Sequence, residues 1–295
     1  HDDHMDNYFL NNYFNKNMKI IINQFPSPSL RKRLNKLGFE NVYEIPTKEK
    51  LIFNDFEVIS VFDETISNDD AGITFRDDNY CIHHGNDNWF PLKKHNLDKL
   101  KQFAKNRKFL YCSQTNSAAG HPLTYPQYKE TKNEILSLKV FRMISAGIEN
   151  VKKLGADYFL PYAGYSKSYV KNKNYHLEAF DPTYKNLKKL TKKFKLLDTE
   201  KLIDIFPGGT INLSNGNVEY PFNFNPEKLI KITNDYLINE NFINQCDTYN
   251  EKFNDEKIKE ISLENYLLEL ANFIHDYLIR FPDFYPSIKK KKVCF

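Results

Sequence analysis

The stretch His1-Asp2-Asp3-His4-Met5-Asp6-Asn7 opens the chain and decides how the rest of it is interpreted. Two histidines and two carboxylates lie within the first four residues, a composition that suits neither a helix nor the core of a strand. Imidazole and carboxylate groups are the usual protein ligands of zinc, iron and manganese, and a tight turn directs several of them at one point. The stretch predicts a metal-binding loop; the alternatives are a vector-derived remnant or an ordinary polar tail.

The composition of the 295 residues fits one large domain, or one domain with an appendage. Hydrophobic residues make up 41% and aromatic residues 15%, which is ample for a core. The four cysteines are scattered, form no Cys-x-x-Cys pair, and fit a reducing cytoplasm. No run of about 18 apolar residues is present, so we expect no membrane span.

The formal charge of +4 comes from lysines spread over polar faces. The lysine-rich runs 188–195 and 289–292 are not accompanied by aromatic and arginine side chains, so we interpret them as solvated faces rather than a track for phosphates. We expect a small-molecule substrate and no nucleic acid as partner.

Hydrophobic patterns predict alternating strands and helices in the first 181 residues. Acidic loops follow several of the strands, and this order indicates an α/β sandwich with its site at one edge of the sheets. We expect helices over 6–14, 30–37, 97–103 and 129–154, and strands over 18–22, 41–45, 56–62, 72–75, 80–83, 109–113 and 157–161.

The remainder of the chain changes character near Asp181-Pro182. We therefore expect a metal domain over 1–181 and a small α+β extension, mostly helical, over 182–295. Short β segments are expected at 201–206, 210–213 and 217–218, and helices at 229–237, 242–253 and 263–279.

Two acidic residues at predicted strand ends are candidates to complete a metal site. Glu64 follows the strand that ends at Phe62, and Asp87 follows the next hairpin, after Gly85 and Asn86. A carboxylate at such a position can bridge two cations, because each oxygen can bind one metal. The alternatives are an ordinary polar turn at Asp87 and an exposed loop acid at Glu64.

The opening stretch resembles the tail of the His-x-His-x-Asp-His metal loop of the metallo-β-lactamase superfamily. His1 matches the second histidine, Asp3 the aspartate and His4 the last histidine. The resemblance implies an αββα sandwich with a two-metal site. The first histidine of the motif would precede the chain by two positions, so we expect the chain to be truncated at its N-terminus.

Further blocks resemble the metallo-β-lactamase-like domain of the CMP-N-acetylneuraminate hydroxylase family. The likeness covers roughly residues 1–215 and depends on the order of several short motifs. They are Asn68-Asp69-Asp70-Ala71-Gly72-Ile73, Gly85-Asn86-Asp87, Ser117-Ala118-Ala119-Gly120-His121-Pro122-Leu123-Thr124-Tyr125, and Leu154-Gly155-Ala156-Asp157-Tyr158-Phe159-Leu160-Pro161-Tyr162-Ala163-Gly164.

The resemblance implies a ligand set for two metal ions, with a catalytic role for Asp3 and Asp87. Where the wider superfamily has a third histidine, this chain has Glu64 or Asp63, and this harder ligand favours iron over zinc or manganese. Superfamily hydrolases carry a last histidine where this chain has Ala163, so the second metal would keep open positions. The expected ligands are His1, Asp3, His4, Glu64 and Asp87, with Asp63, His84, His121 and Tyr162 as further candidates for metal or substrate contact.

Two enzymatic functions and one non-enzymatic function remain open. The first is a di-iron oxygenase, or hydroxylase, acting on a sugar nucleotide or an amide-bearing small molecule. Its electrons would come from a Rieske-type donor on another segment or protein, because the one Cys-x-His of this chain, Cys81-Ile82-His83, has no second Rieske motif beside it. The others are a zinc or manganese hydrolase of a phosphodiester, lactone or amide, which needs no reductant, and a non-catalytic metal scaffold.

Overall fold

The structure is a computed structural model. It describes residues 5–25, 27–47, 49–62, 70–115, 131–163, 184–206 and 208–221, with a few isolated positions between 225 and 272. None of the helices in this described part is long and apolar enough to cross a membrane.

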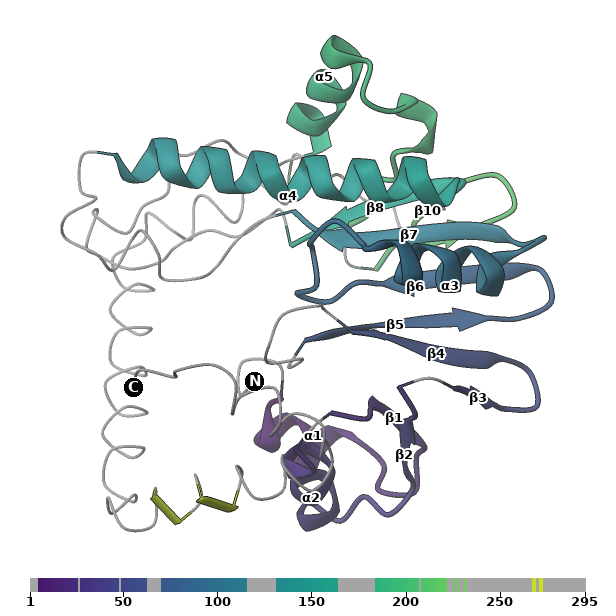
Figure 1. Cartoon of the computed structure of the whole chain (residues 1–295), viewed down its shortest axis with the longest axis vertical. Coiled ribbons are helices and arrows are strands. Elements are labelled where there is room, and N and C mark those ends of the chain that lie inside the picture. The colour runs from purple at the N-terminus through teal and green to yellow at the C-terminus, as the bar shows by residue number, and fades with distance from the viewer. Residues whose placement is uncertain are drawn as a thin grey trace, which may run out of the picture.

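A mixed six-stranded sheet forms the centre of the fold (Figure 1), and the α/β class predicted from the sequence is confirmed. The first four strands form an antiparallel meander, whereas β6, β7 and β8 are parallel and need helical crossovers. In sheet order the strands are β3 (Lys50–Ile52), β4 (Glu57–Phe62), β5 (Ala71–Arg76), β6 (Tyr80–His84), β7 (Lys108–Gln114) and β8 (Tyr158–Tyr162).

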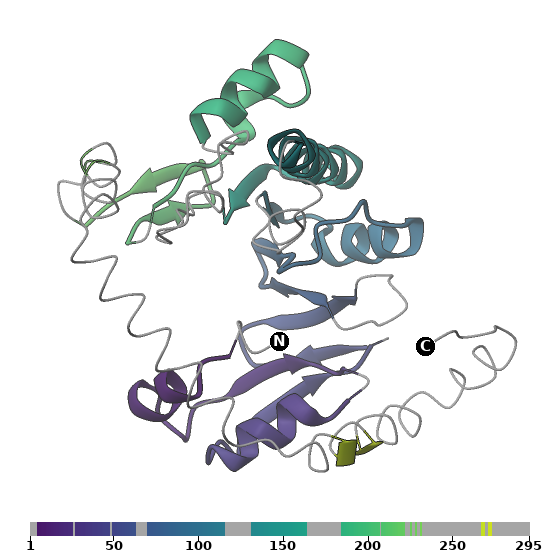
Figure 2. The same cartoon turned by 90° about the vertical axis from the view of Figure 1, so that its left-hand side faces the viewer.

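The directions of these strands bring several chain ends to one edge of the sheet. β4 and β6 both run antiparallel to β5, so their carboxyl ends lie on the same side as those of β7 and β8. The amino end of β5 meets them there, since Ala71 pairs with Phe62 and Ile73 with His84. We call this side the candidate edge; it lies on the left in Figure 1 and faces the viewer in Figure 2.

Helices α3 (Lys94–Ala104) and α4 (Lys132–Leu154) cover one face of the sheet (Figure 2). Leu100 and Ile144 are among the helical residues that pack on Val61, Tyr111 and Phe159 of the strands. The apolar spacing of both helices explains why they form there, because residues three to four apart share one helical face.

The end of α4 follows from Gly155. This residue adopts a left-handed conformation with φ of 69°, which glycine tolerates without steric cost. Its N–H donates to Lys152 O, and the N–H of Ala156 donates to Val151 O at 3.1 Å, so the last carbonyls of the helix are satisfied.

The sequence pattern of α4 is only half confirmed by its burial. Leu138 and Phe141 share the three-to-four spacing of the buried residues Ile144, Ile148 and Val151, yet they are 51% and 43% exposed. Both belong to the N-terminal half of α4, which extends beyond the described strands of the sheet (Figure 1).

The opposite face of the central sheet is covered by the chain after α5 (Tyr184–Phe194). The hairpin of β9 (Thr210–Asn212) and β10 (Asn217–Glu219) contributes Ile211 and Val218, which pack with Leu110 and Cys112. The strand expected over 201–206 is wrong, since η4 (Thr199–Lys201) leads to a single bridge between Leu202 and Phe159. The boundary near residue 181 stays a prediction.

A smaller layer precedes the central sheet. It holds α1 (Asn7–Tyr13), α2 (Ser29–Lys36) and the parallel strands β1 (Ile20–Asn23) and β2 (Val42–Ile45), as predicted within a few residues. Asn23 joins the layer to the central sheet, because its Oδ1 accepts from Ser60 Oγ at 2.5 Å and its Nδ2 donates to Ala71 O at 3.4 Å.

His83 lies in the core between the central sheet and the helices. Its ring stacks on Tyr111 at 5.1 Å between centroids, and its Nδ1 lies 2.8 Å from Thr74 Oγ1. Burial, with a smaller contribution from nearby His84, lowers the pKa of His83 to about 3. The residue is therefore a neutral core histidine at physiological pH.

We predict that His83 makes the free energy of unfolding depend on pH between about 6.5 and 3. In this window the unfolded chain binds one proton more than the native chain, so stability falls as pH falls. This residue should contribute a loss of about 2 kcal/mol between pH 7 and pH 5, measured by urea unfolding at both values. His83→Gln should flatten the slope, and an unchanged slope in that variant would contradict the prediction.

Candidate functional site

The structure places one of the five expected metal ligands directly. Asp87 lies in the turn after β6, at the candidate edge. β4 ends at Phe62, immediately before Asp63 and Glu64 in the sequence, and β7 ends at Gln114, before the segment that contains His121. His1, Asp3, His4, Asp63, Glu64 and His121 lie outside the described residues, so their convergence on Asp87 stays a prediction.

The turn that carries Asp87 (residues 85–88, the Asp87 turn) is held by backbone hydrogen bonds. Gly85 N donates to Cys112 O at 3.0 Å, which continues the pairing of β6 with β7 beyond the last residue of β6. Asn88 N then donates back to Gly85 O at 3.0 Å and closes the turn. A Cβ at Gly85 would lie 3.2 Å from both Asn88 O and Cys112 O, so glycine allows this close approach.

Two buried amides fix the end of β4 beside this turn. Asn88 Nδ2 donates to Val61 O and Asn96 Nδ2 donates to Phe62 O, each at 3.3 Å. The attachment point of Asp63 and Glu64 is thus held next to the turn that carries Asp87. No local pattern marks these two amides, because their partners become evident only once the strands are paired.

His84 and Tyr162 come together behind the Asp87 turn. Their rings stack with centroids 4.6 Å apart and planes at 17°, and Tyr162 Oη donates to Asn86 O at 2.5 Å. Burial raises the pKa of the Tyr162 phenol, so the hydroxyl remains a donor. Partial desolvation lowers the pKa of His84.

The hydrogen bond from Asn86 N to His84 Nδ1, at 3.3 Å, bears on the role of His84. When Nδ1 accepts a hydrogen bond, the neutral ring carries its proton on Nε2. Metal binding through Nε2 would require the other tautomer and would break the bond to Asn86. The geometry therefore favours His84 and Tyr162 as supports of the turn, while a ligand role for either stays a prediction.

Two residues other than glycine have positive φ at the candidate edge. Asn86 has φ of 52° and Ala163, just after β8, has φ of 58°. Asparagine tolerates this region well, whereas alanine does so at a cost of about 1–2 kcal/mol. Thr115 holds the chain just before Ala163, since its N and Oγ1 donate to Tyr162 O at 3.0 and 3.1 Å. Such strain is typical of functional sites.

The chemistry of the described part of the edge fits a metal site only in part. Asp87 offers carboxylate oxygens, which suit iron, manganese or zinc. Among the described residues, however, no group of three or more His, Cys, Asp or Glu side chains could hold a metal ion. A complete site would need donors from the opening stretch and from the segment after β4. Cys81 and His83 are unsuited to bind an iron–sulfur cluster, because both are buried in the core. Burial also raises the pKa of the Cys81 thiol to about 12, so the thiolate ligand is disfavoured.

We predict that Tyr162→Phe lowers the free energy of unfolding by about 1–2 kcal/mol, because Asn86 O loses its hydrogen-bond donor. The ring and its stacking on His84 are retained in this variant. Tyr8→Phe serves as the control, since Tyr8 is 70% exposed and should change stability little. Urea unfolding measures both variants, and equal effects would contradict a role for the Tyr162 hydroxyl in holding the turn.

Comparison with known proteins gives no family assignment. No protein-family model matches the chain, and no curated protein matches it. Among solved structures, a possible metal-dependent hydrolase from Veillonella parvula is 13% identical, with a TM-score of 0.43, over 74% of this chain and 72% of that chain.

Two further solved structures are similar to parts of the chain. The metallo-beta-lactamase fold protein YhfI from Bacillus subtilis is 14% identical, with a TM-score of 0.38, over 72% of this chain and 69% of that chain. CmlA, a diiron beta-hydroxylase from Streptomyces venezuelae, is 17% identical, with a TM-score of 0.35, over 49% of this chain and 30% of that chain. Similarity at this level assigns neither a family nor an activity to the chain.

Proposed function

We propose that the chain is a dinuclear-metal enzyme of the metallo-β-lactamase fold whose reaction takes place at the candidate edge. One observation carries the proposal: Asn88 holds the end of β4 against the Asp87 turn, and Asn96 of α3 holds the last carbonyl of the same strand. Asp63 and Glu64 follow the last residue of β4 directly in the sequence. The acidic stretch 63–64 therefore begins beside the turn that carries Asp87. The order of histidines and aspartate in the opening stretch supports the same site.

In this proposal Asp87 is the carboxylate that bridges the two metal ions. His1, Asp3, His4 and Glu64 complete the ligand set, with Asp63 as the substitute for Glu64. The metal ions, when bound, would supply activation of dioxygen or of water. Tyr162 holds Asn86 O, and this bond fixes the backbone immediately before the bridging residue.

The ligand types favour an oxygenase over a hydrolase. Glu64 in place of a histidine hardens the ligand set, and Ala163 in place of a ligand leaves positions open on the second metal. Ala163 lies at the carboxyl end of β8, at the candidate edge. The proposed reaction is the hydroxylation of a sugar nucleotide or an amide-bearing small molecule, with electrons from a Rieske-type partner.

The alternative is a zinc or manganese hydrolase, and one observation favours it. The chain has a single Cys-x-His motif, and that motif lies in the core, where it is not placed to hold an iron–sulfur cluster as an electron donor. A hydrolase needs none. The further alternative, a metal scaffold without turnover, would bind metal at the same residues and catalyse neither reaction.

We predict that Asp87→Asn weakens metal binding by about tenfold or more, because the amide keeps the shape of the carboxylate but loses its charge. Elemental analysis after dialysis against limiting metal measures the content per chain. Asp78→Asn is the matched control, since Asp78 is an exposed aspartate in the hairpin turn between β5 and β6, away from the candidate edge. Equal metal content in the two variants would contradict a bridging role for Asp87.

We also predict that the chain, reconstituted with ferrous iron without oxygen, binds two iron ions and changes its optical spectrum when oxygen is admitted. Two irons are expected because a bridging carboxylate serves a pair of ions. The same preparation with zinc should not hydrolyse bis(4-nitrophenyl) phosphate. Failure to bind iron, together with stoichiometric zinc and turnover of this phosphodiester, would establish the hydrolase instead.

A further inference from the structure

A cavity of about 300 Å³ opens beside the Asp87 turn. Its apolar lining comes from Phe62, Phe90, Pro91 and Leu92, and Asn88, Lys93 and Asn96 add polar groups. The cavity thus shares Asn88 with the Asp87 turn and Phe62 with the end of β4, the two segments that the proposed function brings together. We call it the Phe90 cavity.

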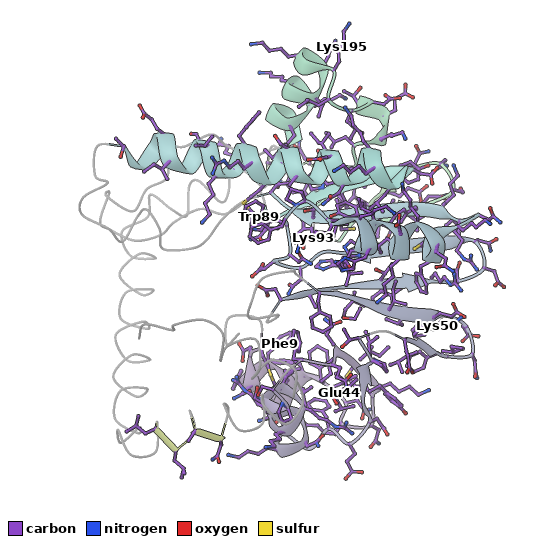
Figure 3. The ribbon with its side chains drawn as sticks, viewed as in Figure 1. Phe9, Glu44, Lys50, Trp89, Lys93 and Lys195 are labelled. Carbon is purple, nitrogen blue, oxygen red and sulfur yellow. The ribbon has the colours of Figure 1, made fainter. Side chains whose placement is uncertain are left out.

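An aromatic pair marks the wall of this cavity. Phe90 is 44% exposed and stacks on Trp89, with ring centroids 4.3 Å apart and planes at 21°. Figure 3 shows Trp89 and Lys93 at the same end of the sheet. An exposed phenylalanine on the wall of a cavity offers a flat surface on which a ligand ring can stack.

The wall is held rigidly by a buried side chain of α4. Asn150 Nδ2 donates to Phe90 O at 3.1 Å, and Leu92 N donates to Asn150 Oδ1 at 2.9 Å. The same Nδ2 lies 2.9 Å from Tyr111 Oη in the core. The wall is therefore formed before any ligand binds, which lowers the entropic cost of binding.

Among the polar side chains of the lining, Asn88 has a defined capacity for hydrogen bonding. Asn88 is buried, and its Nδ2 donates to Val61 O. Its Oδ1 is consequently the side-chain atom left to accept a hydrogen bond from a ligand. A ligand that carries an N–H or O–H next to a flat ring matches this lining.

We propose that the Phe90 cavity binds an aromatic group of the substrate, one or two rings in size and carrying a hydrogen-bond donor. The size limit follows from volume, since a cavity of about 150 Å³ holds benzene and whole-ligand pockets begin near 300 Å³. The inference rests on the proposed function in one respect: the group held here belongs to the molecule that reacts at the candidate edge.

The experiment uses 4-nitrobenzamide, a flat ring with an amide donor, as the probe. Trp89 is the one tryptophan of the chain, so quenching of tryptophan fluorescence by the nitro group reports binding beside this cavity. Equilibrium dialysis gives the dissociation constant independently of fluorescence. Saturable binding by both methods is the expected result, and absence of binding would overturn the proposal.

Phe90→Ala should weaken binding by about tenfold, through loss of stacking and of apolar contact. The control is Phe141→Ala, which removes a phenylalanine of nearly equal exposure, 43%, from α4. Because both side chains are exposed, both variants should fold. Equal affinity of the two variants in dialysis would overturn the assignment of the probe to the Phe90 cavity.

The metal variant separates this inference from the proposed function. Asp87→Asn should retain the affinity for the probe, because the carboxylate does not line the cavity. Probe binding that depends on Phe90 in a chain that binds no metal would refute the proposed function and leave the aromatic site standing. Metal binding without probe binding would refute the aromatic site alone.

Discussion

The close approach of β5 to the end of β6 is the constraint on which the candidate edge depends. A Cβ at Gly72 would lie 2.7 Å from His83 Cε1 and 2.9 Å from His84 O, closer than side-chain atoms come in proteins. Because Gly72 has no side chain, His83 can occupy the core beneath β5. His84 then lies on the other face of β6, as the alternation of a strand requires, and meets Tyr162.

The close backbone approaches at Gly72 and Gly85 bring the Asp87 turn next to the buried core. His83 and Tyr111 belong to the buried layer that holds the helices on the sheet, and the Asp87 turn begins two residues after His83. Both ends of the bond from Tyr162 to Asn86 O adjoin left-handed backbone, which Asn86 tolerates well and which strains the chain at Ala163. The packed core keeps these residues in place, and the strain is stored where the chemistry is proposed.

Much of this fold was predictable from the sequence, because strands and helices were marked by hydrophobic period. The runs at β4, β6 and β7 alternate or bury β-branched and aromatic residues, and Gly155 marks the end of α4. The strand over 201–206 was wrong because pairing with the edge strand β8 stops after one bridge at Leu202, and Ile203 and Ile205 pack on the face of the sheet instead. An apolar run alone does not distinguish these two outcomes.

Of the candidate site, the position of Asp87 after a strand was predictable, and the convergence of the other expected ligands on it stays a prediction. A turn of the type Gly-Asn-Asp-Asn after a strand indicated where Asp87 lies, and the strand before Asp63 indicated the neighbouring end. The roles of Asn88, Asn96 and Asn150 could not be predicted from the sequence. Each role depends on a hydrogen bond from the side-chain amide to a backbone carbonyl that is distant in the sequence. Such long-range contacts depend on tertiary structure and not on local pattern.

The segment 85–92 joins the proposed metal ligand to the proposed aromatic site in one stretch of backbone. Asn88 holds β4 through its Nδ2 and lines the Phe90 cavity, while Asn150 fixes the wall of that cavity from α4. Hydrogen bonds of Asn88 and Asn150 hold this segment at two points. A ring that bound against Phe90 would therefore leave the position of Asp87 unchanged. Two amide side chains would then keep the aromatic site at a fixed position relative to Asp87, whether or not either site is occupied. This arrangement would orient a substrate relative to the metal ions without direct contact between the ring and any ligand.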